Sequence, residues 1–143
     1  MKKFYLSILL TTLIAVITAS CATFPEQVIN PLTDTTWKLM TYAGTNPLAG
    51  KNMTAAFDGK GISGSASCNH YFGSYKLKKD QITISELGWT EMACLDPEGI
   101  MEQEQIIMKM LSESDTFTIK GDRLQITTSS GDFLIFQQLI AID

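Results

Sequence analysis

The feature that most limits the fold is a series of short segments with alternating apolar residues, separated by tight turns. The alternation predicts strands at residues 37–42, 53–57, 62–67, 69–77, 81–85, 116–119, 124–127 and 133–136. Glycine-containing turn signals lie between them, at residues 58–61, 121–122 and 129–132. A period of 2 is typical of half-buried strands, and short turns join antiparallel neighbours. The sequence therefore predicts an antiparallel meander of about eight short strands.

One helix is predicted between the fifth and sixth of these strands. It is expected to begin at Asp96-Pro97-Glu98, where Asp96 can cap free N–H groups and Pro97 needs no donor. We expect it to end near Ser112. Its apolar stripe is expected to face the core and consists of Ile100, Ile107, Met108 and Leu111. The fold class is therefore mainly β (α+β), a curled sheet or partly open barrel with the helix covering or plugging one opening.

Two glycines mark special backbone within the strands. Gly64 lies in a strand of small residues, which suggests a bend or a close approach of two backbones. Gly73 interrupts the fourth predicted strand and indicates a β-bulge.

The N-terminus has the pattern of an export signal. Lys2 and Lys3 precede an apolar stretch at 4–17, which is too short for a comfortable membrane span. Residues 18–21, Thr-Ala-Ser-Cys, resemble the lipobox of bacterial lipoproteins, whose cysteine becomes the lipidated first residue. Thr18 stands where that motif usually has Leu or Val, and ordinary signal-peptidase cleavage after Ala19 or Ser20 is the alternative.

These signals predict the organisation of the chain. We expect a signal peptide at 1–20, a lipid on Cys21, a flexible tether at 21–35 and a domain at 36–139. Ala22, by resemblance to proteobacterial sorting rules, favours the outer membrane, with the domain facing the periplasm. We expect a monomer held at the membrane by its lipid.

Charge excludes one class of partner. Loss of Lys2 and Lys3 lowers the Lys and Arg count from 11 to 9 against 15 Asp and Glu, so the mature net charge is about −6. Such an acidic domain has no electrostatic footprint for nucleic acid. We expect no nucleic-acid partner.

Two separated motifs resemble those of a known family. They are Gly64-Ser-Ala-Ser-Cys68-Asn69-His-Tyr71-Phe-Gly73-Ser-Tyr75 and Thr90-Glu-Met92-Ala-Cys94. Together with the leader, these motifs and their order resemble the META domain (DUF306) family, to which HslJ-like heat-shock lipoproteins belong. Ser67 stands where the family often has glycine before the cysteine, so the local backbone conformation is slightly harder to adopt here.

The resemblance implies a non-enzymatic envelope protein without a cofactor. Members have roles in stress, motility and antibiotic tolerance, so we expect a stress-related module that binds an unidentified envelope protein. Binding of a small apolar ligand or lipid is the first alternative. A pilotin-like secretin chaperone is the second, by analogy of fold alone. The motif residues that form a possible binding surface are Asn69, Tyr71, Gly73, Tyr75, Thr90 and Met92.

Cys68 and Cys94 remain in the domain once Cys21 is assigned to lipid. In an oxidising compartment an even pair is most simply a disulfide, here closing a loop of about 26 residues. One alternative is a thiol nucleophile at Cys68 with His70 as its base. Others are a metal held by Cys68, His70 and Cys94, or two unpaired thiols. We favour the disulfide and predict no metal site.

The remaining polar residues have structural interpretations. Asn69 is expected to bond turn backbone and fix the approach to the bridge. Tyr71 and Tyr75 share a face and either pack in the core, which we favour, or line a groove. The carboxylates, with Glu102 and Glu104 among them, are expected on a solvated face and form no identifiable catalytic pair.

Overall fold

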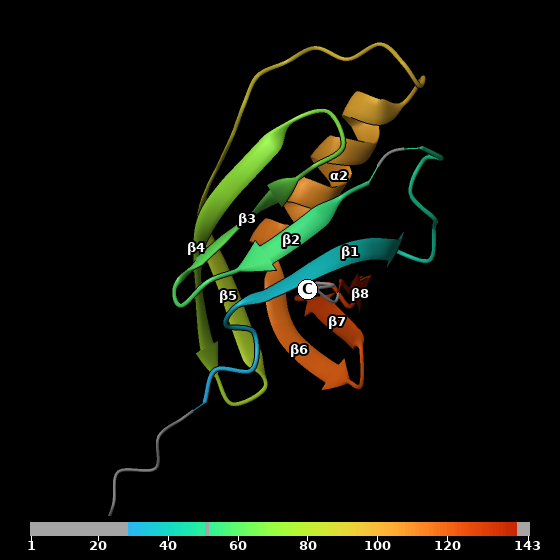
Figure 1. The fold of residues 1–143 in the computed structure, drawn as a ribbon. Coiled ribbons are helices and arrows are strands. Elements are labelled where there is room, and N and C mark those ends of the chain that lie inside the picture. The colour runs from blue at the N-terminus through green and yellow to red at the C-terminus, as the bar shows by residue number, and fades with distance from the viewer. Residues whose placement is uncertain (1–28, 51, 140–143) are drawn as a thin grey trace, which may run out of the picture.

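The computed structural model describes residues 29–50 and 52–139, and in this part of the chain eight antiparallel strands form a closed barrel in chain order (Figure 1). The expected signal peptide and Cys21 lie outside the described residues. The strands are β1 (Thr35–Tyr42), β2 (Thr54–Phe57), β3 (Gly61–Ser65), β4 (His70–Lys78), β5 (Gln81–Trp89), β6 (Ser114–Lys120), β7 (Arg123–Thr128) and β8 (Phe133–Gln138). The predicted fold class and strand order are confirmed.

The barrel closes between its first and last strands. β1 pairs with β8 in a register that includes Trp37↔Gln138 and Tyr42↔Leu134. The packed chain begins before β1, because Leu32 is fully buried and Asn30 Nδ2 donates to the Tyr75 hydroxyl at 2.7 Å. Folded structure thus extends back to about residue 30, a few residues before the expected boundary at 36.

The junction between β5 and β6 has the shortest pairing among the described strands of the barrel. β5 pairs with β6 at Gln81↔Thr116, and the Phe117 N–H donates to the Asp80 carbonyl at 2.8 Å. β5 continues to Trp89, well past the predicted end at residue 85, and over that length it pairs with β4 as far as Tyr71↔Trp89. The described pairing of β5 with β6 is thus at the first residue of β5, and β5 also contacts α2.

The helix, α2 (Ile100–Ser112), begins later than the sequence predicts. Its N-cap is Gly99, with φ of 82° and no side-chain cap, so the predicted Asp96 cap is wrong. The Asp96–Pro97 peptide is cis and lies in the preceding turn, where the Pro97 carbonyl accepts the Ile100 N–H at 3.2 Å. Glycine fits this start because it adopts positive φ without the Cβ penalty. The predicted end at Ser112 is confirmed.

The core is one cluster shared by barrel and helix. Trp37, Tyr71 and Phe136 are its largest buried aromatic side chains. The predicted stripe of α2 is buried, and Ile107, Met108 and Leu111 join the same cluster. Within the residues described, no helix combines the length and hydrophobicity needed to cross a membrane.

Both glycine predictions are confirmed. The pairing of β4 with β5 changes register between Phe72 and Ser74, so Gly73 lies at an irregularity of the bulge type. Gly64 lies where β3 and β2 approach closely. A Cβ placed there would be 1.9 Å from the Thr54 carbonyl oxygen.

Replacement of Gly64 by Ala is therefore expected to lower the free energy of unfolding by about 3 kcal/mol or more, because backbone must move to admit a methyl group. Chemical denaturation followed by circular dichroism measures the change. Gly59→Ala is the matched control, since a Cβ there meets nothing within 4 Å, and it should change stability by less than about 0.5 kcal/mol. Equal stabilities of the two variants would contradict the close approach.

Candidate functional site

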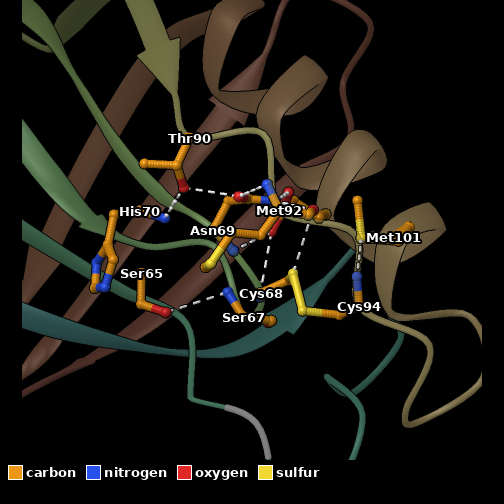
Figure 2. The surroundings of a disulfide bond; sticks show 10 residues. Ser65, Ser67, Cys68, Asn69, His70, Thr90, Met92, Cys94 and Met101 are labelled. Atoms are coloured by element: carbon orange, nitrogen blue, oxygen red, sulfur yellow. Dashed lines mark hydrogen bonds between the residues drawn. A yellow bond between two sulfur atoms is a disulfide. The ribbon is translucent and has the colours of Figure 1, made fainter.

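A disulfide joins two loops that are distant in sequence. Cys68 lies in the turn between β3 and β4, and Cys94 lies in the segment 90–99 that leads from β5 to α2 (Figure 2). Their Cα atoms are 6.0 Å apart, and 26 positions separate them in the chain. The favoured pairing is confirmed. The thiol-nucleophile and metal hypotheses both require free cysteines, so they do not fit this structure.

Glu104 of α2 lies beneath the Cys68 turn and is only 3% exposed. Its Oε2 accepts the backbone N–H groups of Asn69 at 2.8 Å and of Cys68 at 3.2 Å. Its Oε1 accepts Asn69 Nδ2 at 2.6 Å. The expectation that this carboxylate is solvated is wrong, because three N–H donors compensate its burial.

The sequence did contain a signal for this burial. Glu104 follows Ile100 by four residues and precedes Ile107 by three, so it lies on the apolar stripe of the helix. Charged side chains are almost never fully buried unless paired. A carboxylate at such a position therefore indicates a partner elsewhere in the fold, here the backbone of the Cys68 turn.

The side chain of Asn69 connects this turn to the segment after β5. Its Oδ1 accepts Thr90 Oγ1 at 2.7 Å and the Met92 N–H at 2.8 Å, and its Nδ2 also donates to the Met92 carbonyl at 3.1 Å. Thr90 Oγ1 in turn accepts the His70 N–H at 3.2 Å. Figure 2 shows Asn69 lying between Thr90 and Met92, beside the disulfide. Asn69 thus fixes the approach to the bridge, as predicted.

Ser67, directly before Cys68, occupies the motif position where the family often has glycine, and its backbone has a positive φ. Ser67 has φ of 98°, in the region that favours glycine. Its Oγ accepts Gln103 Nε2 at 3.0 Å, and Gln103 Oε1 accepts the Leu48 N–H at 2.7 Å. Gln103, a second buried polar residue of α2, therefore stabilises a turn for which serine is not the easiest residue.

The tyrosines of the motif belong to the core. Tyr71 donates its hydroxyl to the Thr54 carbonyl at 2.9 Å, and burial raises the pKa of that hydroxyl. Tyr75 donates to the Asp58 carbonyl at 2.7 Å. Both side chains are buried, so the favoured core interpretation is confirmed, and neither they nor the buried Asn69 offers a contact surface. Of the residues predicted as a surface, Thr90 and Met92 are exposed and Gly73 is half-buried.

The cross-linked segment 90–99, which carries Cys94 of the disulfide, has exposed apolar side chains. Leu95 is 91% exposed and Met92 is 50% exposed, while Trp89, at the end of β5, is 50% exposed. His70 is exposed on β4. Among the described residues, no group of three or more His, Cys, Asp or Glu side chains could hold a metal ion.

A groove lies between the second half of β5 and α2, that is, between sheet and helix. Its volume is about 640 Å³. Its lining residues are Glu86, Leu87, Trp89, Glu104, Gln105, Met108, Lys109 and Ser112. Glu104 therefore belongs to both places: it accepts hydrogen bonds from the Cys68 turn and it lines the groove.

Comparison with known proteins identifies relatives of this fold. The family model of the META domain matches residues 30–140. The NMR structure of a protein from Burkholderia xenovorans is 30% identical, with a TM-score of 0.62, and the match covers 76% of this chain and 83% of that one. A second NMR structure is 25% identical, also with a TM-score of 0.62, covering 76% and 94%.

A more distant structure shares the fold alone. It is the crystal structure of a DUF4847 family protein from Bacteroides vulgatus, 8% identical with a TM-score of 0.55, covering 75% of this chain and 94% of that one. No curated protein matches the sequence.

Proposed function

We propose, since this chain belongs to the META domain family, that it is a non-enzymatic envelope lipoprotein whose rigid β domain binds a partner protein. The observation that carries the proposal is the cross-linked segment 90–99, which holds exposed apolar side chains in a fixed place. Preorganised apolar residues at a surface are typical of interaction sites, because little conformational entropy is lost on binding.

The polar groups of the site support binding instead of chemistry. Cys68 and Cys94 are joined to each other, and the Asn69 side chain is engaged at both of its polar atoms. Glu104 accepts three hydrogen bonds from the turn. Groups bonded in this way position a surface, whereas a nucleophile or general base needs a free lone pair directed at a substrate.

The location follows from the N-terminal pattern. A lipid on Cys21 would hold the domain at the outer membrane, facing the periplasm, and Ala22 supports that destination. The Cys68–Cys94 bridge agrees with an oxidising compartment, where disulfides form and persist. Relation to HslJ-like proteins supports a role under stress.

Binding of a small apolar ligand is the second candidate function. The groove beside α2 favours it, since its volume of about 640 Å³ lies within the usual range of ligand pockets, about 300–1,000 Å³. Leu87, Trp89 and Met108 would supply its apolar contacts.

Photo-crosslinking in living cells tests the first candidate against the second. A photoreactive amino acid replaces Leu95 in the full-length protein, and the matched control carries it at Thr118, an exposed residue of β6. We expect one discrete protein adduct from position 95 and none from position 118. No adduct from position 95, together with an apolar molecule released when the purified protein is denatured, would favour the second candidate.

A further inference from the structure

We propose that the groove between β5 and α2 is the docking site for an extended, basic segment of a partner protein, which pairs with the free edge of β5. The inference rests on the proposed function and specifies its site and the chemistry of the partner. Three features of the described residues carry it: an unpaired strand edge, an apolar groove along it, and an acidic stretch of chain that contributes to the groove lining.

The unpaired edge results from the short pairing of β5 with β6. On one side, β5 pairs with β4 from Lys78↔Gln81 to Tyr71↔Trp89. On the other side, its pairing with β6 in the described chain is Gln81↔Thr116. The part of β5 near Trp89 therefore presents backbone N–H and C=O groups without a neighbouring strand, and such an edge is a template for an added strand.

The groove gives an added strand somewhere to place its side chains. Leu87 and Trp89 line it from β5, and Met108 lines it from α2. Because Trp89 is half-exposed, one face of its ring can cover an apolar side chain or stack against a guanidinium group. Backbone pairing and side-chain pockets together are how edge strands recognise extended peptides.

The charge around the groove selects a basic occupant. From Asp80 to Met108 the sequence contains no Lys, Arg or His. Over the same stretch it has seven acidic residues: Asp80, Glu86, Glu91, Asp96, Glu98, Glu102 and Glu104. Two of these, Glu86 and Glu104, line the groove, and the Glu86 side chain is exposed, whereas the Glu104 carboxylate is buried against the Cys68 turn. The lining also holds one cation, Lys109, whose Nζ lies 3.6 Å from Glu113 Oε1.

The same charge argues against other occupants. A fatty acid would bring its carboxylate to an acidic surface, and a second copy of this chain would bring its own acidic side. A helical segment could not pair with the edge, since its backbone bonds are already made within the helix. An extended segment with apolar residues between Lys or Arg residues satisfies all three features.

The test is an NMR titration of the mature chain with Cys21→Ser and an intact disulfide. The probe is an acetylated peptide of alternating lysine and valine. One control peptide replaces lysine by glutamate, and another keeps every side chain but has alternate backbone amides methylated. We expect saturable shifts of the Leu87, Trp89 and Met108 amides with the probe, and binding at least about tenfold weaker with either control.

Protein variants test the groove itself. Trp89→Ala should weaken probe binding about tenfold or more, as loss of an aromatic anchor does. The matched control, Phe72→Ala, removes an aromatic side chain that is 62% exposed on neighbouring β4 and outside the groove lining, and should change affinity less than twofold. Lys109→Glu should tighten binding severalfold, which keeps the inference testable if Trp89→Ala fails to fold.

Several results would overturn the inference. The first three concern the probe: no binding, shifts that map away from the groove, or equal binding of the methylated peptide. A fourth is that dodecanoate binds the protein by itself and displaces the probe. A fifth is concentration-dependent dimerisation through the groove. If position 95 still crosslinks a partner while the probe fails, the proposed function stands and the groove assignment falls. If both fail, both proposals fall.

Discussion

Replacement of Glu104 by Gln is expected to lower the free energy of unfolding by about 2–4 kcal/mol, although the two side chains have nearly the same shape. Both carboxylate oxygens accept N–H groups, Oε2 from the Cys68 and Asn69 backbone and Oε1 from Asn69 Nδ2. Whichever way a Gln amide is turned, its NH₂ group faces an N–H donor. Chemical denaturation of the mature domain measures the loss.

Asn69 cannot relieve this conflict by rotating its own amide. Its Oδ1 accepts the Met92 N–H and Thr90 Oγ1, so a flip would move the donor-to-donor contact to Met92. Glu102→Gln is the matched control, because Glu102 is exposed two residues earlier on the same helix and should change stability by less than about 0.5 kcal/mol. If Glu104→Gln is as mild as that control, the buried carboxylate does not hold the turn.

Removal of the disulfide by the double variant Cys68→Ala and Cys94→Ala is expected to lower the free energy of unfolding by about 3–3.5 kcal/mol. The bridge spans 26 positions and stabilises chiefly by limiting the unfolded chain. Denaturation of the wild type with and without reductant provides the comparison, since reduction removes the same constraint without substitution.

The two stabilising features are expected to be coupled. Glu104 bonds the N–H of Cys68 itself, so loss of the bridge loosens the turn that the carboxylate needs. A double-mutant cycle with Glu104→Gln should therefore show an interaction energy of about 0.5–3 kcal/mol. Strict additivity would show that carboxylate and disulfide act on separate parts of the fold.

Local sequence patterns predicted most of the barrel. Alternation of the kind seen at residues 81–85 marks which side of a strand is buried, and Gly73 marked the irregularity in β4. The start of the helix was misplaced because Asp96-Pro97 has the local chemistry of an N-cap. The chain instead makes a further turn, and Gly99 becomes the N-cap of α2. The tertiary structure thus overrides the local preference for a helix start at Asp96.

The site was only half predictable. Compartment and cysteine number predicted the Cys68–Cys94 bridge, and the role of Asn69 followed from the turn chemistry of its residue type. Burial of Glu104 depends on what faces the helix, which no local pattern contains, although its place on the apolar stripe was visible. The groove depends on β5 extending beyond its pairing with β6, and this is a property of two strands that are distant in sequence.

The rigid surface proposed for binding requires Cys68 and Cys94 to form a structural cross-link in the mature protein, and counting free thiols tests this directly. The Cys21→Ser protein would be isolated from the periplasm, unfolded, and alkylated with and without reductant before mass spectrometry. We expect no label without reductant and a label on both cysteines with it. Labelling of both without reductant would contradict the cross-link and direct attention to Cys68 and His70 as a reactive or metal-binding pair.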